Sequence, residues 1–150
     1  MSQCAYVYFE DMVPGRVLRS ASLPPLTRDA ILAFAREFDP QPQHLGEASA
    51  ADSNLGVFCA SGWHTGSLTM RAIAETMPIK GGGMGAGIEI RWPRPVVVGD
   101  VLHVEIEVMQ ARPSNSRPDK GVVIFRTTTF NQRDEPVQHC THTALFPRRG

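Results

Sequence analysis

An aspartate and a histidine lie close together in a short proline-containing stretch, residues 38–44, with the sequence FDPQPQH. A proline fixes its own φ angle and disfavours the helical conformation for the residue before it, so a helix that ends at Phe38 cannot continue through Asp39. We therefore expect an extended loop that presents Asp39 and His44 together. A carboxylate and an imidazole held in this way can bind one water molecule and move its protons. The structural alternative is that Asp39 ends one helix and His44 begins the next.

A short amphipathic helix is expected to position Asp39. Thr27 is a suitable N-cap, and the carboxylate of Asp29 suits the positive end of the helix dipole in the first turn. Apolar residues then recur at helical spacing up to Phe38. The sequence therefore predicts a helix that begins after Thr27 and ends immediately before Asp39.

A second helix is predicted from Ala60 to Met77, where Pro78 ends it. A helix that is apolar nearly all round is typically enclosed by the rest of the fold. Small residues in its first turns would let backbone or a ligand approach closely. Its apolar positions fall on one face and on the side opposite, namely Trp63, Gly66, Met70, Ile73 and Met77, and then Leu68 and Ala72.

Strands are expected in the second half of the chain, because the hydrophobic period there changes to alternation. We predict strands at 16–23, 88–92, 101–110, 122–130 and 137–146, and a flexible glycine-rich connection at 81–87. Leu102, Val104 and Ile106 alternate with polar residues, which indicates a sheet with one dry and one wet face. One helix followed by long antiparallel strands favours an α+β fold, with a curved antiparallel sheet wrapped around the central helix. We expect a single domain over residues 1–150.

The composition excludes several classes of function. The chain has 150 residues, 42% of them hydrophobic, and its 15 basic side chains balance 15 acidic ones. Such a chain has no field that would attract nucleic acid or an anionic membrane. The three cysteines, Cys4, Cys59 and Cys140, form no C-x-x-C pair, so neither a disulfide framework nor a zinc site is indicated. No stretch approaches the ~20 apolar residues that span a bilayer, and no signal peptide is evident, so we expect a soluble cytoplasmic protein.

Two further patterns point away from cofactors. The glycine-rich stretch at 81–87 precedes a strand and lacks the Lys-Ser/Thr of a phosphate-binding loop. His139 and His142 would point to opposite faces of a strand, so they are expected to be surface or packed histidines rather than metal ligands.

Several pieces of the chain, taken together and in order, resemble one family over roughly residues 6–146. That family is the MaoC-like acyl-CoA hydratases and dehydratases of the hot dog fold, which include R-specific enoyl-CoA hydratases. The chain carries Gln41 where the family commonly has Asn, and Gly46 where family members often have an acidic residue. The resemblance rests on Tyr8-Phe9-Glu10-Asp11 with Pro14-Gly15, on the segment 38–44, on Ala60-Ser61-Gly62, and on Pro95-Val96-Val97-Val98-Gly99-Asp100.

The resemblance implies a hydro-lyase that reversibly hydrates an α,β-unsaturated acyl-CoA thioester, with no metal or redox cofactor. Asp39 and His44 match the catalytic pair, and Gly62 matches the glycine whose backbone N–H serves as an oxyanion-hole donor. We expect neighbouring residues to contact the substrate, namely Gln41, Ser61, Trp63 and His64. For His64 the alternative is a buried structural hydrogen bond. The resemblance also implies a homodimer or higher homo-oligomer with active sites at the subunit interface.

Two alternatives share this fold. A hot dog thioesterase would hydrolyse the thioester with an acidic side chain on or near the central helix. The only acidic residue in the predicted central helix is Glu75, close to its C-terminal end. A non-catalytic acyl-thioester-binding or partner subunit would keep the fold without turnover. Around the long loop after the third predicted strand, Arg112, Arg117 and Lys120 are either contacts for CoA phosphates or exposed charges of a hairpin.

Overall fold

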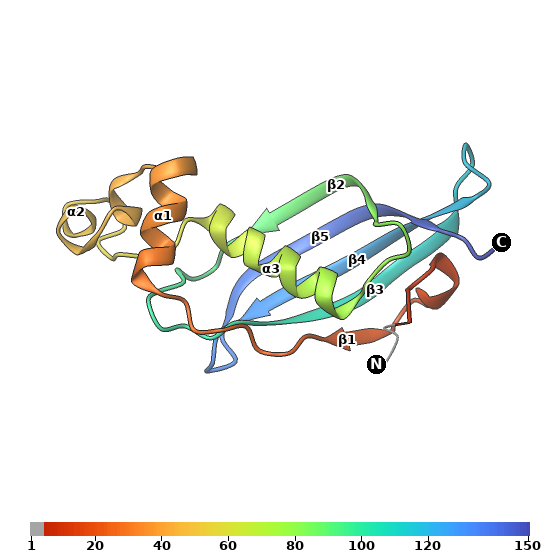
Figure 1. Cartoon of the computed structure of the whole chain (residues 1–150), viewed down its shortest axis with the longest axis horizontal. Helices are drawn as coiled ribbons and strands as arrows, with labels where there is room; N and C mark the ends of the chain where they lie inside the picture. The colour runs from red at the N-terminus through yellow and green to blue at the C-terminus, as the bar shows by residue number, and fades with distance from the viewer. Residues whose placement is uncertain (1–4) are drawn as a thin grey trace.

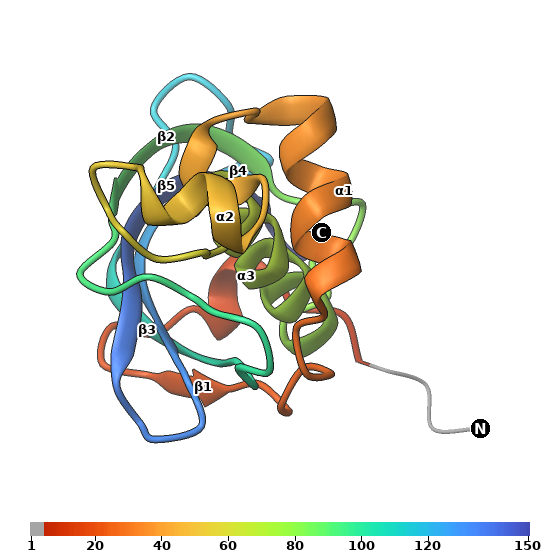
Figure 2. The ribbon, with the colours of Figure 1, turned by 90° about the vertical axis from the view of Figure 1, so that its left-hand side faces the viewer.

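The computed structural model describes residues 5–150, so Cys4 lies outside the described part. Five strands form one antiparallel sheet in the order β1-β3-β4-β5-β2. The sheet curves around α3, while α1 and α2 lie together at one end of it (Figures 1 and 2). This confirms the α+β prediction. The elements are η1 (Phe9–Asp11), β1 (Val17–Arg19), α1 (Arg28–Phe38), η2 (Pro42–His44), α2 (Glu47–Ala51), α3 (Gly62–Thr76), β2 (Met84–Arg91), β3 (His103–Pro113), β4 (Lys120–Phe130) and β5 (Pro136–Pro147).

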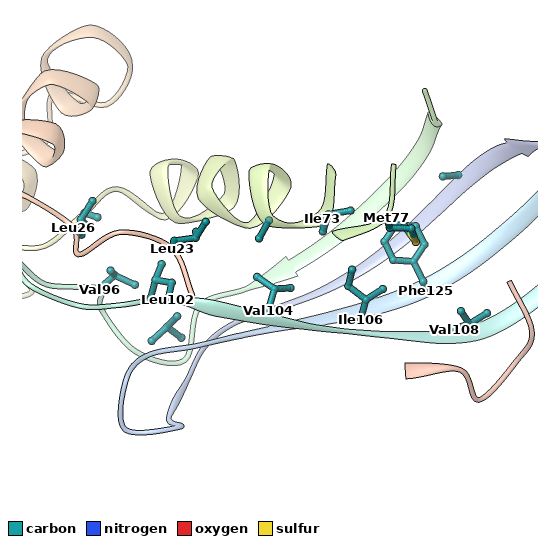
Figure 3. Packing of buried hydrophobic residues seen from close by; sticks show 14 of the residues in the cluster. Leu23, Leu26, Ile73, Met77, Val96, Leu102, Val104, Ile106, Val108 and Phe125 are labelled. Atoms are coloured by element: carbon teal, nitrogen blue, oxygen red, sulfur yellow. The ribbon is translucent and has the colours of Figure 1, made fainter. Parts of the chain in front are cut away.

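The core lies between α3 and the concave face of the sheet. Val104 and Ile106 of β3 are fully buried, as their alternation with polar residues predicted. They face Ile73 of α3 and Met77, the C-cap of that helix (Figure 3). On the other face of the sheet, polar side chains pair across strands. The dry face therefore holds α3 in place, and α3 in turn fixes where its N-terminus lies.

The face of α3 that turns away from the sheet is less covered than the sequence predicted. Thr69, Ala72 and Ile73 are buried, whereas Trp63 is 58% exposed and Met70 is 50% exposed. The prediction of an enclosed helix was therefore wrong for a single chain. The sheet wraps one side of the helix, and no other element of residues 5–150 covers the Trp63–Met70 side.

The strands β1 and β2 differ most from their predicted bounds, while β3, β4 and β5 differ by at most three residues at either end. β1 is a strand only over Val17–Arg19, although Ser20 N–H still donates to the carbonyl oxygen of Val104 in β3, and Leu23 N–H donates to that of Leu102 just before β3. β2 begins at Met84, inside the stretch predicted to be a flexible connection, and its register with β5 shifts between Gly85 and Gly87. β2 is an edge strand, because the sheet order ends with it. No helix in the described part of the chain is long and apolar enough to cross a membrane.

Candidate active site

The segment after α1 brings Asp39 and His44 together. Thr27 caps α1 by accepting from Ala30 N–H, and Asp39 ends the helix as its C-cap, as predicted. The prediction of an extended loop was wrong, because Pro42–His44 forms a 3-10 turn with proline at its start, where the fixed φ angle of proline suits a helix. This turn folds the chain back and leaves His44 Nε2 3.4 Å from Asp39 Oδ2.

The backbone fixes the orientation of the His44 ring. His44 Nδ1 lies 2.7 Å from the carbonyl oxygen of Cys59. A carbonyl oxygen can only accept, so Nδ1 carries the hydrogen and donates it. In the neutral ring, Nε2 then presents its lone pair on the side of Asp39. A single water molecule can donate one hydrogen to Nε2 and the other to the carboxylate.

Two neutral donors hold the Asp39 carboxylate. Ser61 Oγ donates to Oδ2 at 2.6 Å, and Gln41 Nε2 donates to Oδ1 at 2.7 Å. Burial by itself would raise the pKa of Asp39, but these two hydrogen bonds, together with the positive charge of His44 when its ring is protonated, outweigh it and lower the pKa below its usual value. Asp39 is therefore ionised at neutral pH, in the form that can accept a proton.

The N-terminus of α3 borders the same space. Ser61 is the N-cap and accepts from Trp63 N–H, which leaves Gly62 as the first helical residue. Gly62 N–H has no hydrogen-bond partner within residues 5–150, and the helix dipole adds partial positive charge there. The indole of Trp92 packs directly on Gly62, and a Cβ on this glycine would lie 2.6 Å from Trp92 Cε2. Only glycine fits beneath that ring.

A cavity of about 350 Å³ joins these groups. It contains five of the seven predicted site residues: Asp39, Gln41, His44, Gly62 and Trp63. Carboxylate, imidazole and a free backbone N–H thus face one space, which suits proton transfer next to a developing negative charge. The remaining lining residues are Leu55, Cys59, Ala60, Thr65, Trp92, Pro93, Arg94, Pro95 and Val96.

Comparison with known proteins identifies the family of this chain. The family model described as MaoC like domain matches residues 11–129, most of the chain. The chain belongs to the MaoC-like family. Its sheet and central helix therefore form the hot dog fold of that family.

The MaoC-like chain is similar to proteins named as dehydratases and hydratases. It is 44% identical to the MaoC-like dehydratase of Rhodospirillum rubrum, with a TM-score of 0.90 over 96% of this chain and 99% of that one. It is 26% identical to an R-hydratase of Pseudomonas aeruginosa, with a TM-score of 0.74 over 96% of this chain and 88% of that one. It is 29% identical over 115 residues to a 3-hydroxybutyryl-CoA dehydratase of Methylorubrum extorquens, which covers 74% of this chain and 69% of the relative.

For Ser61 and His64 the geometry favours roles other than the predicted substrate contacts. Ser61 is fully buried, and its hydroxyl is committed to Asp39. His64 does not line the cavity of the MaoC-like site. Its ring stacks on Phe34 with centroids 4.7 Å apart, its Nδ1 is buried without a partner, and burial lowers its pKa. Both residues therefore lie behind the cavity wall.

The sequence did not point to three contributors to the site. Trp92 and Arg94 line the cavity because the chain turns away after β2, where Pro93-Arg94-Pro95 interrupts the strand pattern. Cys59 contributes its carbonyl oxygen, which no side-chain pattern reveals. The β3–β4 connection that carries Arg117 lies at the end of the sheet away from α1 and α2 (Figure 1).

Proposed function

We propose that this MaoC-like protein is a hydro-lyase that reversibly adds water to an α,β-unsaturated acyl-CoA thioester. One observation carries the proposal: an ionised Asp39 lies 3.4 Å from the free Nε2 of His44, in the cavity that the N-terminus of α3 borders. The names of its relatives support it, because they include a 3-hydroxybutyryl-CoA dehydratase and an R-hydratase.

The thioester carbonyl would bind at Gly62. Hydration of the C2–C3 double bond moves electron density onto the carbonyl oxygen, which needs a donor that is already in position. The free N–H of Gly62 supplies that donor, and the helix dipole adds to it. Loss of one comparable donor raises a barrier by about 2.7–4 kcal/mol, so this contact would contribute a large share of the catalysis.

The Asp39 and His44 pair would supply the proton transfers. Water held by both side chains attacks C3 through its oxygen, and the carboxylate of Asp39 takes its proton as the C3–O bond forms. The electron pair of the double bond moves toward C2 and the carbonyl oxygen. C2 then takes the proton that Asp39 accepted from the water, and His44 helps to return it. Both fragments come from one water on one face, so syn addition is expected, and dehydration of the 3-hydroxyacyl thioester is the reverse path.

We further propose that the functional unit is a homodimer or higher homo-oligomer that pairs through β2. The free edge of β2 offers backbone hydrogen-bonding groups, and apolar Trp63, Met70 and Ile88 are exposed beside it. In a two-fold antiparallel pair centred on β2, the first half of one strand faces the second half of the other. The second half of α3 in one subunit would then adjoin the catalytic cavity of its partner, beside which the acyl chain would extend.

An assay with crotonyl-CoA tests the reaction. Hydration is expected to remove the enoyl absorbance without releasing free thiol, while a dehydration assay with a 3-hydroxyacyl-CoA restores it. Release of thiol would instead indicate a thioesterase. Binding of acyl-CoA esters without reaction in either direction would indicate a non-catalytic acyl-thioester-binding or partner subunit.

A further inference from the structure

A second and larger cavity, of about 620 Å³, lies along the second half of α3 and the first half of β2. Its walls are mostly Met, Ile, Ala, Gly and Phe residues, among them Met70, Ile73 and Ile88. Ile73, Met77 and Phe125 converge at this end of the helix (Figure 3). His142 is the one ionisable residue in its lining. A buried imidazole in such apolar surroundings requires a reason, because an unpartnered polar group there loses its hydration.

One ring nitrogen of His142 has a partner and the other does not. His142 is 7% exposed, its ring stacks on Phe125 with centroids 4.5 Å apart, and Nε2 lies 3.1 Å from Thr127 Oγ1. Nδ1 makes no hydrogen bond within residues 5–150. Among residues 5–150, the only side-chain nitrogen or oxygen that is fully buried and has no hydrogen-bond partner is Nδ1 of His64. Nδ1 of His142 also has no partner, so it is not fully buried, and the space that this residue lines is the cavity.

The chemistry of this nitrogen selects the group that fits it. Burial lowers the pKa of His142 to about 4, so the ring is neutral near pH 7. The Thr127 hydroxyl can donate to Nε2 or accept from it, so Nδ1 either carries a hydrogen or presents a lone pair. A hydroxyl group on a ligand satisfies both cases because it donates and accepts. A carboxylate satisfies only one, and it would lose its hydration among apolar side chains.

We propose that His142 makes this cavity selective for an acyl group that carries a hydroxyl group in its distal part, away from the thioester. The proposal rests on the proposed acyl-CoA substrate and names its class. The apolar walls hold the hydrocarbon stem, and Nδ1 of His142 binds the hydroxyl. An acyl chain of the same length without the hydroxyl leaves that nitrogen without a partner and binds less tightly.

Titration calorimetry with saturated acyl-CoA esters tests the selectivity without turnover. At each of a series of chain lengths, the ester with a terminal hydroxyl is compared with the plain ester. We expect the wild-type protein to prefer the hydroxylated ester by about 2- to 12-fold in Kd at the length that reaches His142, the range for a neutral hydrogen bond. His142→Phe keeps a ring to stack on Phe125 and should abolish the preference. His139→Phe changes the exposed histidine on the other face of β5 and should keep it.

The outcomes separate this proposal from the proposed function. No preference in the wild type at any length, or a preference that survives His142→Phe, overturns the role of His142. Absence of binding by every ester also overturns it. If His142→Phe does not fold, His142→Met fills the site with a flexible apolar side chain and gives the same comparison. An enzyme that is inactive on crotonyl-CoA but binds the hydroxylated ester through His142 refutes the hydro-lyase and leaves the selectivity standing.

Discussion

The cavities at the two ends of α3 differ in their lining residues as well as in their volume. The cavity at the N-terminus of the helix is about 350 Å³ and gathers Asp39, Gln41 and His44, whereas the cavity along its second half is about 620 Å³ and has His142 as its one ionisable residue. Polar groups are concentrated where the helix offers free N–H groups, and volume is concentrated where it offers only side chains. The N-terminal end of α3 thus suits reacting atoms, and its second half suits a part of a substrate that is only recognised.

The two histidines show the same contrast at the scale of single atoms. His44 has its tautomer fixed, because Nδ1 donates to a backbone carbonyl that can only accept. His142 has no such constraint, because Thr127 can act as donor or acceptor. A fixed tautomer suits proton transfer in a defined direction, and an adaptable one suits recognition.

The largest expected effect lies at the N-terminal cavity. Asp39→Asn and His44→Ala should each lower kcat/KM for crotonyl-CoA at least about 100-fold, within the range for a lost general acid or base, while the protein stays folded. Steady-state kinetics and circular dichroism measure both properties. Asp52→Asn, an exposed change on the neighbouring α2 side, should leave the rate within about twofold. Near-normal turnover in either site variant would remove the difference between the two cavities.

The second effect tests the apolar cavity through the pH dependence of stability. His142 has a folded pKa of about 4 against an ordinary value of 6.5, so the unfolded chain binds more protons between these values. The stability from the neutral ring is fully present above pH 6.5 and is lost as pH falls toward 4. Urea unfolding should show His142 contributing up to about 3 kcal/mol to that loss. The loss should shrink in His142→Phe, and an unchanged pH profile in that variant would place the titration elsewhere.

The third effect concerns the packing of Trp92 on Gly62 at the N-terminal end of α3. Gly62→Ala should lower the free energy of unfolding by about 1–3 kcal/mol, because its Cβ would overlap the Trp92 indole. Gly66→Ala is the matched control on the same helix. Its Cβ would meet its nearest neighbours at 3.7 Å, and alanine favours a helix interior. If urea unfolding shows equal effects for both glycines, tight packing of Trp92 on Gly62 is not what distinguishes this end.

The smallest effect concerns how Asp39 is held. Ser61→Ala removes the 2.6 Å donor to Asp39 Oδ2 and should lower kcat/KM about tenfold, as for a lost hydrogen bond to a charged group. Its loss also raises the pKa of Asp39, so the acid limb of the pH–rate profile should move to higher pH. Ser67→Ala changes an exposed serine on the same helix and should move neither. A rate change without a shift of the acid limb would show that Ser61 only caps the helix.

Local patterns predicted much of the fold. The alternation of Leu102, Val104 and Ile106 identified β3 and its buried face, and Thr27 marked the start of α1. The strand inside the glycine-rich stretch was missed because glycine has low strand propensity, and pairing with β5 decides its conformation. The exposure of Trp63 was missed because an apolar pattern does not reveal whether the same chain or another covers a residue.

Only those residues of the candidate site whose types and spacing suggest chemistry could be predicted from the sequence. Asp39 and His44 followed from their spacing around two prolines. The part played by Ser61 depends on tertiary structure, because it is set by a contact 22 positions along the chain from Asp39. The environment of His142 depends on the sheet, which brings Phe125 and Thr127 of β4 against it.

The bond between His44 and Cys59 has a consequence for how this protein can change. Position 59 aligns the imidazole through its main-chain oxygen, which every amino acid possesses. The thiol adds only a longer contact, 3.8 Å from Sγ to His44 Nδ1, so another small apolar group can replace it while the bond to the carbonyl oxygen is kept, provided the peptide keeps its path. Substitutions at this position would be tolerated during evolution, and a comparison of side chains alone would overlook a residue that helps to orient the imidazole of His44.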